Sequence, residues 1–148
     1  MLDSYKKLQE KFGLPHLDKL QSAFQFEIDE KVDLNDIRDE ISTKLFDFTE
    51  REIEPLLWSA HYCHAVERNM LVPQEAQQVF ELYKQIQALR WRNNLLTIRP
   101  DPEETAHWIA DMWNFWKQFD QIVGSLCSKF STGWEKLNIK EAVAEYQG

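Results

Sequence analysis

The chain has 148 residues, a length typical of one domain, and a net charge of −8 from 17 basic and 25 acidic side chains. This charge argues against binding to nucleic acid, where Lys and Arg neutralise phosphates, and against docking on an anionic membrane. The charged first residues do not resemble a signal peptide and no apolar run is long enough to cross a bilayer, so we expect a cytoplasmic protein.

The first third of the chain predicts one short helix and one longer helix. The short helix covers residues 4–12 and ends at Gly13 and Pro15. Residues 16–32 mix weak helical and extended patterns, so we expect an irregular segment there. The longer helix begins at Asp33, a residue type that favours the N-cap position. Its apolar stripe recurs at steps of three and four residues: Leu34, Ile37, Ile41, Leu45 and Phe48.

Two prolines mark the middle of the chain. Pro55 either kinks the longer helix or opens a new helix that runs to Asn69. Pro73 is expected in the first turn of another helix, with apolar residues at Val79, Leu82, Tyr83, Ile86 and Leu89 on one face. That helix is predicted to end at residues 93–94, because asparagine tolerates a left-handed C-terminal conformation. Residues 95–100 then form a link.

The clearest predicted element follows this link. Asp101 is expected at the N-cap and Pro102 at the first helical position. A heptad-like seam then runs along the helix: Ile109, Met112, Trp116, Phe119, Val123, Leu126 and Phe130. The helix is predicted to stop at residues 132–133, and a final short helix is expected over residues 139–146.

This pattern predicts an all-α fold: an antiparallel bundle of three or four main helices with short helices at both ends. We expect one domain over residues 1–148. Within it, residues 1–32 form a short helix and an irregular segment, residues 33–131 form the bundle core, and residues 132–148 form a tail with a short helix. Cys63 and Cys127 lie far apart in helical patterns, which predicts reduced, partly buried thiols.

Histidines and carboxylates suggest one metal-binding alternative. On the last long helix, Glu104, His107 and Asp111 share a face, and the first two form the Glu-x-x-His unit of carboxylate-bridged metal bundles. His61 and His64 are three residues apart on an earlier predicted helix. Together these five residues predict a site for Fe, Mn or Zn. However, Glu-x-x-His occurs once, and the face with His107 and Asp111 is opposite the apolar seam, which favours a solvated surface.

Two further patterns were considered as binding motifs. Glu27-x-x-Glu30 with Asp36-x-x-Asp39 is similar to the Mg²⁺-binding motifs of helical nucleotide pyrophosphohydrolases, but the first pair falls in the irregular segment. The basic and aromatic segment at residues 89–94, with Arg99, has a composition that can bind nucleic acid. Its arginines point to different sides of the helix, so pairing with the acidic half of the same chain, where carboxylates gather from Glu27 to Glu54, is the better interpretation.

The chain contains 6 Trp, 9 Phe and 4 Tyr, an unusual aromatic content. Trp108, Trp113 and Phe115 spread around the last long helix. They either fill the core or form an exposed flank that docks a partner protein or a second copy. No pattern assigns a catalytic residue. The leading hypothesis is a non-enzymatic protein–protein interaction or assembly module that uses this aromatic flank, and the alternative is a metal-dependent helical-bundle enzyme.

One resemblance concerns the first third of the chain. The stretch from Tyr5 to Pro15, the segments Leu17–Leu20 and Phe24–Glu27, and the helix at Asn35–Ile41 resemble the start of a family of small all-helical archaeal proteins. Some of residues 82–90 share the similarity. That family implies no activity, so the resemblance supports only the helical, cytoplasmic interpretation.

Overall fold

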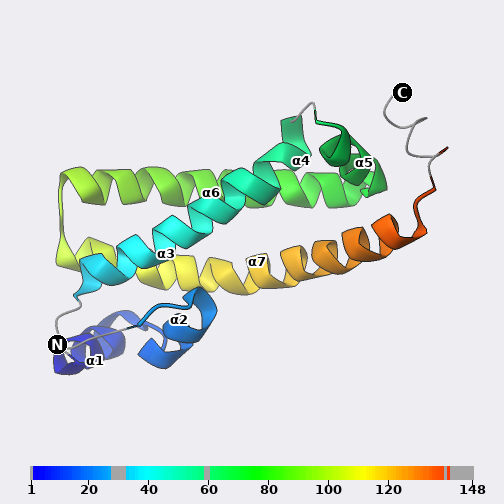
Figure 1. The fold of residues 1–148 in the computed structure, drawn as a ribbon. Coiled ribbons are helices and arrows are strands. Elements are labelled where there is room, and N and C mark those ends of the chain that lie inside the picture. Colours follow the sequence, from blue (N-terminus) through cyan, green and yellow to red (C-terminus); the bar gives the residue numbers. More distant parts are fainter. Residues whose placement is uncertain (1, 28–32, 59–60, 139, 141–148) are drawn as a thin grey trace. The chain divides into compact units, whose positions relative to one another are not determined.

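The computed structural model describes residues 2–27, 33–58, 61–138 and 140, and every regular element in these ranges is a helix (Figure 1). In chain order these are α1 (Leu2–Phe12), α2 (Leu17–Phe24), α3 (Leu34–Phe48), a π-helical turn η1 (Thr49–Ile53), α4 (Glu54–Trp58), α5 (Tyr62–Met70), α6 (Pro73–Ile98) and α7 (Pro102–Lys136). The prediction of an all-α fold is confirmed. The antiparallel order of the main helices and the single domain stay predictions, and the expected helix at 139–146 lies outside the described residues.

The prediction of an irregular segment at residues 16–32 is wrong for residues 17–24, because these form the helix α2. Its apolar residues Leu20 and Phe24, one turn apart, are both buried. The end of α2 is stabilised from α3: Lys44 donates hydrogen bonds to the carbonyl oxygens of Phe24 and, at 2.6 Å, of Gln25. These carbonyls have no partner within their own helix, so a cation at this position compensates them.

The start and end of α3 follow from side-chain chemistry. The backbone N–H of Asp36 donates to the Asp33 carboxylate and the N–H of Asp33 donates to the Asp36 carboxylate, each at 2.9 Å, which confirms Asp33 as the N-cap. At the other end the helix widens into the turn η1 directly before Pro55, which has no N–H to donate. The chain then forms α4 and α5 as separate helices, so the prediction of one helix from Pro55 to Asn69 is wrong.

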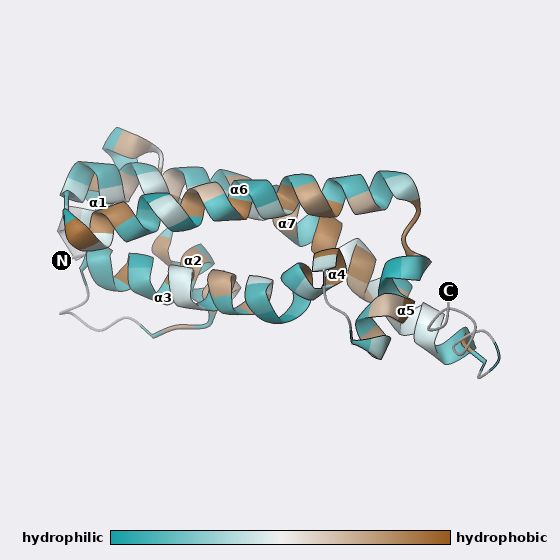
Figure 2. Ribbon diagram, turned by 90° about the horizontal axis from the view of Figure 1, so that it is seen from above, coloured by the Kyte–Doolittle hydropathy of each residue, from teal (hydrophilic) through white to brown (hydrophobic). Residues whose placement is uncertain are grey.

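The two long helices extend beyond their predicted ends. Helix α6 starts at Pro73 as expected but continues through the two asparagines to Ile98, so the link predicted at residues 95–100 is mostly helical. Asp101 does act as the N-cap of α7, because its carboxylate accepts the backbone N–H of Glu104 at 3.0 Å. Helix α7 continues past Gly133 to Lys136. In Figure 2, hydrophobic and hydrophilic residues alternate along both helices.

The chain divides into two compact units that are discontinuous in sequence. Unit 1 comprises residues 1–47 and 87–117, and unit 2 comprises residues 48–86 and 118–148. Among the described helices, none is both long enough and apolar enough to cross a membrane.

Unit 1 has a core of large apolar side chains from α1, α2, α3, α6 and α7. Its buried members include Tyr5, Leu20, Phe24, Ile37, Ile41, Leu45, Leu89, Leu96, Trp108, Ile109, Met112 and Phe115. The Tyr5 hydroxyl donates to the carbonyl oxygen of Pro15 at 2.7 Å, and burial raises the pKa of this tyrosine well above its usual range. Gly13 ends α1 in a left-handed conformation with φ of 66°. The N-terminal helices thus belong to the core of unit 1.

Unit 2 has its own core from η1, α4, α5, α6 and α7, which includes Ile53, Leu56, Val66, Val79, Leu82, Ile86, Phe119, Val123 and Leu126. Polar contacts connect its helices. Lys129 on α7 forms an ion pair with Glu75 at the start of α6, and the Trp134 indole donates to Glu67 on α5 at 3.0 Å. A Cβ atom at Gly133 would lie 2.5 Å from the Met70 sulfur, so the end of the Met70 side chain of α5 packs directly on this glycine of α7.

Candidate interaction surface

The five residues of the metal-binding alternative do not form a ligand set. Glu104, His107 and Asp111 are exposed on α7, where the His107 ring packs against Phe12 and the Asp111 carboxylate pairs with Arg92 at 2.9 Å. His61 and His64, in unit 2, have ring centroids 5.9 Å apart. Within the described ranges, no group of three His, Cys, Asp or Glu side chains is placed to hold a metal ion. Neither the pair His61 and His64 nor the set Glu104, His107 and Asp111 is therefore grouped as a metal site requires.

The aromatic flank predicted on the last long helix is mainly core. Trp108 has no exposed surface, its indole N–H donates to the carbonyl oxygen of Leu89 at 2.9 Å, and Phe115 is buried as well. Trp113 is half-buried. The prediction that Trp108 and Phe115 form an exposed docking flank is wrong, because this helix turns both side chains toward the other helices of unit 1.

The exposed aromatic surface of unit 1 lies on α6 instead. Trp91 is 64 %, Leu95 53 % and Ile98 76 % exposed. At about 100° of rotation per residue, these three positions lie within about 60° of arc on the helix. They form a single apolar stripe, which we call the α6 stripe. The buried residues Leu89 and Leu96 lie about 140° to 160° away, on the opposite side of the same helix.

Sequence reasoning missed the α6 stripe for a specific reason. Asparagine tolerates the left-handed conformation at a helix end, so the sequence predicts a stop at residues 93–94 and a link that contains Leu95 and Ile98. The spacing of Trp91, Leu95 and Ile98, in steps of four and three, is the signal that could have revealed it. Helices usually carry one apolar face, and a second apolar face on the opposite side indicates a second contact.

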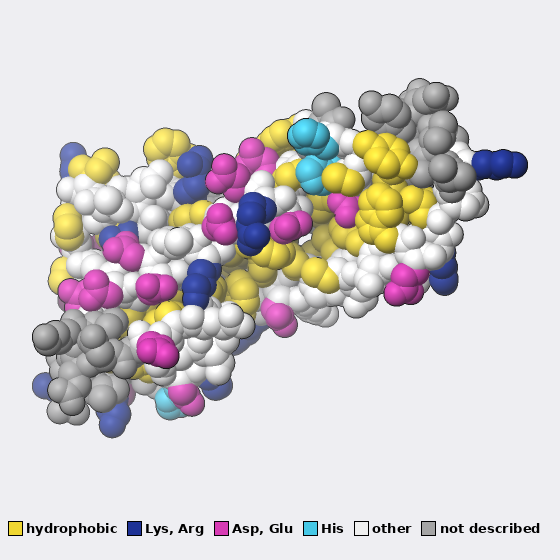
Figure 3. Space-filling model, viewed as in Figure 1, with side chains coloured by type: hydrophobic (Ala, Val, Ile, Leu, Met, Phe, Trp, Pro, Cys, Tyr) yellow, Lys and Arg dark blue, Asp and Glu magenta, His cyan; other side chains and the backbone are white. Residues whose placement is uncertain are grey.

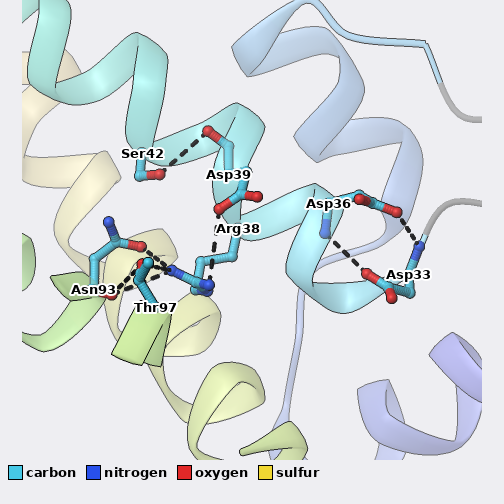
Figure 4. A network of polar contacts seen from close by, with 7 residues as sticks. All are labelled: Asp33, Asp36, Arg38, Asp39, Ser42, Asn93 and Thr97. Carbon is cyan, nitrogen blue, oxygen red and sulfur yellow. Dashed lines mark hydrogen bonds and ion pairs between the residues drawn. The ribbon is translucent and has the colours of Figure 1, made fainter. Parts of the chain in front are cut away.

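The α6 stripe rests on a helix whose inner side is fixed by a buried arginine. Arg38 of α3 is 4 % exposed. One terminal nitrogen of its guanidinium donates to the backbone and side-chain oxygens of Asn93 and, at 3.4 Å, to the hydroxyl of Thr97 (Figure 4). The other terminal nitrogen lies 3.7 Å from the Asp39 carboxylate, and Nε has no acceptor in the described part of the chain. The guanidinium thereby joins α3 to the last turns of α6, beneath the stripe.

Basic side chains border the α6 stripe. The Arg90 guanidinium lies over the Trp91 ring, 5.3 Å from its centroid, and its Nε donates to Gln87 at 2.8 Å. Arg99 is exposed at the other end of the stripe. Arg99 follows the last residue of α6, and its backbone N–H still donates to the Leu95 carbonyl at 2.8 Å. Extending the helical rotation by this one residue places the two arginines on opposite flanks, at about 100° and about 80° from Trp91. Arg92 does form an ion pair within the chain, but its partner is Asp111 of α7, so the prediction that this arginine pairs with the acidic segment Glu27–Glu54 is wrong.

Unit 2 also exposes hydrophobic side chains, which gather over α5 and the end of α7 in the view of Figure 3. Trp58 packs edge-on against Tyr83, and the Tyr83 hydroxyl donates to Glu54 at 3.2 Å. A hollow of about 180 Å³ in the same unit is lined by Phe48, Glu52, Ile53, Leu56, Glu67, Val123, Leu126, Cys127 and Phe130. Both cysteines are free and exposed, so the prediction of partly buried thiols is wrong.

The exposed tryptophans of the two units differ in the contacts that they make with other helices. In unit 2, Trp58 and Trp134 each have an aromatic or hydrogen-bonding partner from another helix. In unit 1, the ring of Trp91 contacts Arg90, its neighbour in sequence. Within the described residues, the α6 stripe is therefore an apolar surface that the other helices leave largely uncovered.

Comparisons of the chain with protein-family profiles, with curated proteins and with solved structures found no match. The candidate surface is accordingly defined by its own geometry: three exposed apolar side chains in one stripe, bordered by two arginines, on a helix fixed from behind by Arg38.

Proposed function

We propose that the chain is a non-enzymatic protein-interaction module that contacts another polypeptide through the α6 stripe. The observation that carries this proposal is the combined exposure of Trp91, Leu95 and Ile98 on one side of one helix. Single exposed apolar residues are common on protein surfaces, whereas contiguous ones mark binding sites. Tryptophan is also among the residues most enriched at the centres of interfaces, because it buries a large area with few rotatable bonds.

Site-specific photocrosslinking in the full chain tests this function. A photoreactive phenylalanine analogue placed at position 91 should form a discrete adduct with another polypeptide in the source cells. A second substitution in the stripe, Ile98→Ser, should greatly reduce that adduct because it removes a neighbouring apolar contact. Asn114, which is exposed on α7 of the same unit, provides the matched control position. Equal adducts at positions 91 and 114, or an adduct that Ile98→Ser leaves unchanged, would contradict the proposed function.

A further inference from the structure

The charges around the α6 stripe differ from those of the chain as a whole. Between Glu81 and Asp101 the sequence contains four basic residues and no acidic one, although the net charge of the chain is −8. Arg92 is paired with Asp111. Arg90 and Arg99 remain on the two flanks of the stripe, and within the described residues neither forms an ion pair with a carboxylate. The stripe is thus an apolar strip between two positive edges.

From this arrangement we propose that the partner of the α6 stripe is an acidic amphipathic helix, with its apolar face on Trp91, Leu95 and Ile98 and carboxylates facing Arg90 and Arg99. The inference rests on the proposed function and names the chemistry of its partner. An amphipathic helix presents apolar residues at the same steps of three and four, so two such stripes can pack along their lengths. Opposite charges beside an apolar seam select the partner and its orientation.

A second copy of this chain fits the surface less well. Pairing α6 with α6 of another copy would bring arginine-bearing edges together, and like charges disfavour that contact. The acidic helix α3 of another copy offers no apolar stripe, because Ile37, Ile41 and Leu45 are buried in unit 1. The α6 stripe also offers only roughly a few hundred Å², whereas each partner in a standard stable interface buries about 800 Å². A single helix is the size of partner that three side chains can accommodate.

The test uses the full chain and three synthetic helical peptides with the same leucine stripe and different flanks: glutamate, glutamine or lysine. Binding is measured by fluorescence anisotropy of labelled peptides at low and high salt. We expect the glutamate peptide to bind about tenfold more tightly than the lysine peptide, since two exposed ion pairs replace two repulsions, and to weaken as salt rises. Equal affinities for the three peptides would overturn the inference but leave an apolar interaction function standing.

Charge reversal supplies the matched control. The double variant Arg90→Glu, Arg99→Glu should reverse the preference and favour the lysine peptide. The variant Lys6→Glu, Lys7→Glu changes the net charge equally at exposed positions on α1 and should keep the wild-type preference. A preference that both double variants reverse would overturn the inference, because it would reflect net charge alone. Tighter binding to vesicles of phosphatidylserine than to the glutamate peptide, lost in the Arg90→Glu, Arg99→Glu variant, would also overturn it in favour of a lipid surface.

The stripe variant Trp91→Ser, Ile98→Ser separates the two proposals. It should abolish binding of the glutamate peptide if the peptide occupies the stripe. Unchanged binding to this variant would contradict the partner inference, because the peptide would then bind elsewhere. The photocrosslink at position 91 is the independent readout of the function itself.

Discussion

Trp108 and Trp91 belong to the same unit, and Trp108 contacts the helix that carries Trp91, yet their environments are opposite. Trp108 points from α7 into the core, where it is fully buried and its N–H is bonded to the Leu89 carbonyl of α6. Trp91 points from α6 away from that core, is 64 % exposed, and packs against Arg90. An unusual aromatic content therefore has two explanations in one molecule: one tryptophan fills the core, and the other belongs to a surface that a partner can use.

The largest expected difference between the two tryptophans is the loss in free energy of unfolding when each is replaced by alanine. Trp108→Ala should lower the free energy of unfolding by about 3–5 kcal/mol, because it leaves a cavity and removes the indole hydrogen bond to the Leu89 carbonyl. Trp91→Ala should change it by no more than about 0.5 kcal/mol, since the side chain is mostly exposed. Urea denaturation followed by circular dichroism measures both. Similar losses for the two variants would mean that Trp91 contributes to the core, and the distinction between the residues would fail.

The next effect concerns the polar contacts behind the stripe. Asn93→Ala should cost about 1–3 kcal/mol, because the buried Arg38 guanidinium loses one of its side-chain acceptors, the Asn93 amide oxygen. Arg38→Met, which removes the buried charge and keeps an apolar side chain of similar length, should be near neutral or stabilising. The double variant should then show no additional penalty from Asn93→Ala. If Arg38→Met costs more than Asn93→Ala in the same denaturation experiment, the guanidinium stabilises unit 1 in its own right.

A smaller effect on stability is expected at two glycines, of which one has a left-handed backbone and the other lies inside a helix. Gly13 has φ of 66°, so Gly13→Ala should destabilise the protein by about 1 kcal/mol. Gly124 lies inside α7, and a Cβ atom there would meet nothing within 4 Å. Gly124→Ala should therefore stabilise the protein by about 0.5–1 kcal/mol. Shifts in thermal midpoint of opposite sign are expected, and peptide binding at the α6 stripe should be unchanged in both variants. A stabilising Gly13→Ala would contradict the assigned end of α1.

The smallest effect is a pH dependence that belongs to unit 2. The hydrogen bond from Lys129 lowers the pKa of Glu75, and the backbone N–H of Val72 adds to this effect. The folded protein thus holds this proton less tightly than the unfolded chain does. The resulting stability is fully present above the usual pKa range of glutamate and is lost as pH falls through the lowered pKa. The urea midpoint of Glu75→Gln should fall less on acidification than that of the wild type. If the urea midpoints of both proteins fell equally on acidification, Glu75 would not contribute to the pH dependence of stability.

The fold class could be predicted because apolar spacing and helix-start residues are local properties. Asp33, Pro73 and Asp101 mark helix starts by side-chain chemistry that acts within a few residues, and all three were identified correctly. Helix α2 was missed because its stability depends on burial of Leu20 and Phe24 and on Lys44 from another helix, which short-range patterns do not contain. The end of α6 was misplaced because Asn93 contacts the buried Arg38 instead of ending the helix.

The candidate surface was harder to predict than the fold. Trp108 and Trp91 are the same residue type in similar helical patterns, and only the packing of neighbouring helices determines which one is buried. The sequence does place Trp91, Leu95 and Ile98 opposite Leu89 and Leu96, but this becomes visible only once α6 is known to continue to Ile98. The metal alternative relied on spacing along single helices, and spacing alone does not bring ligands from two helices together.

The central claim is that the α6 stripe, and not the aromatic residues of α7, receives a partner helix. The most direct measurement follows the six tryptophan indole N–H signals in a ¹H–¹⁵N spectrum, assigned with single Trp→Phe variants, while the glutamate-flanked peptide is added. The account predicts that the Trp91 signal shifts in proportion to the fraction bound and that the Trp108 signal stays in place. A bound peptide that leaves the Trp91 signal unmoved would contradict the claim.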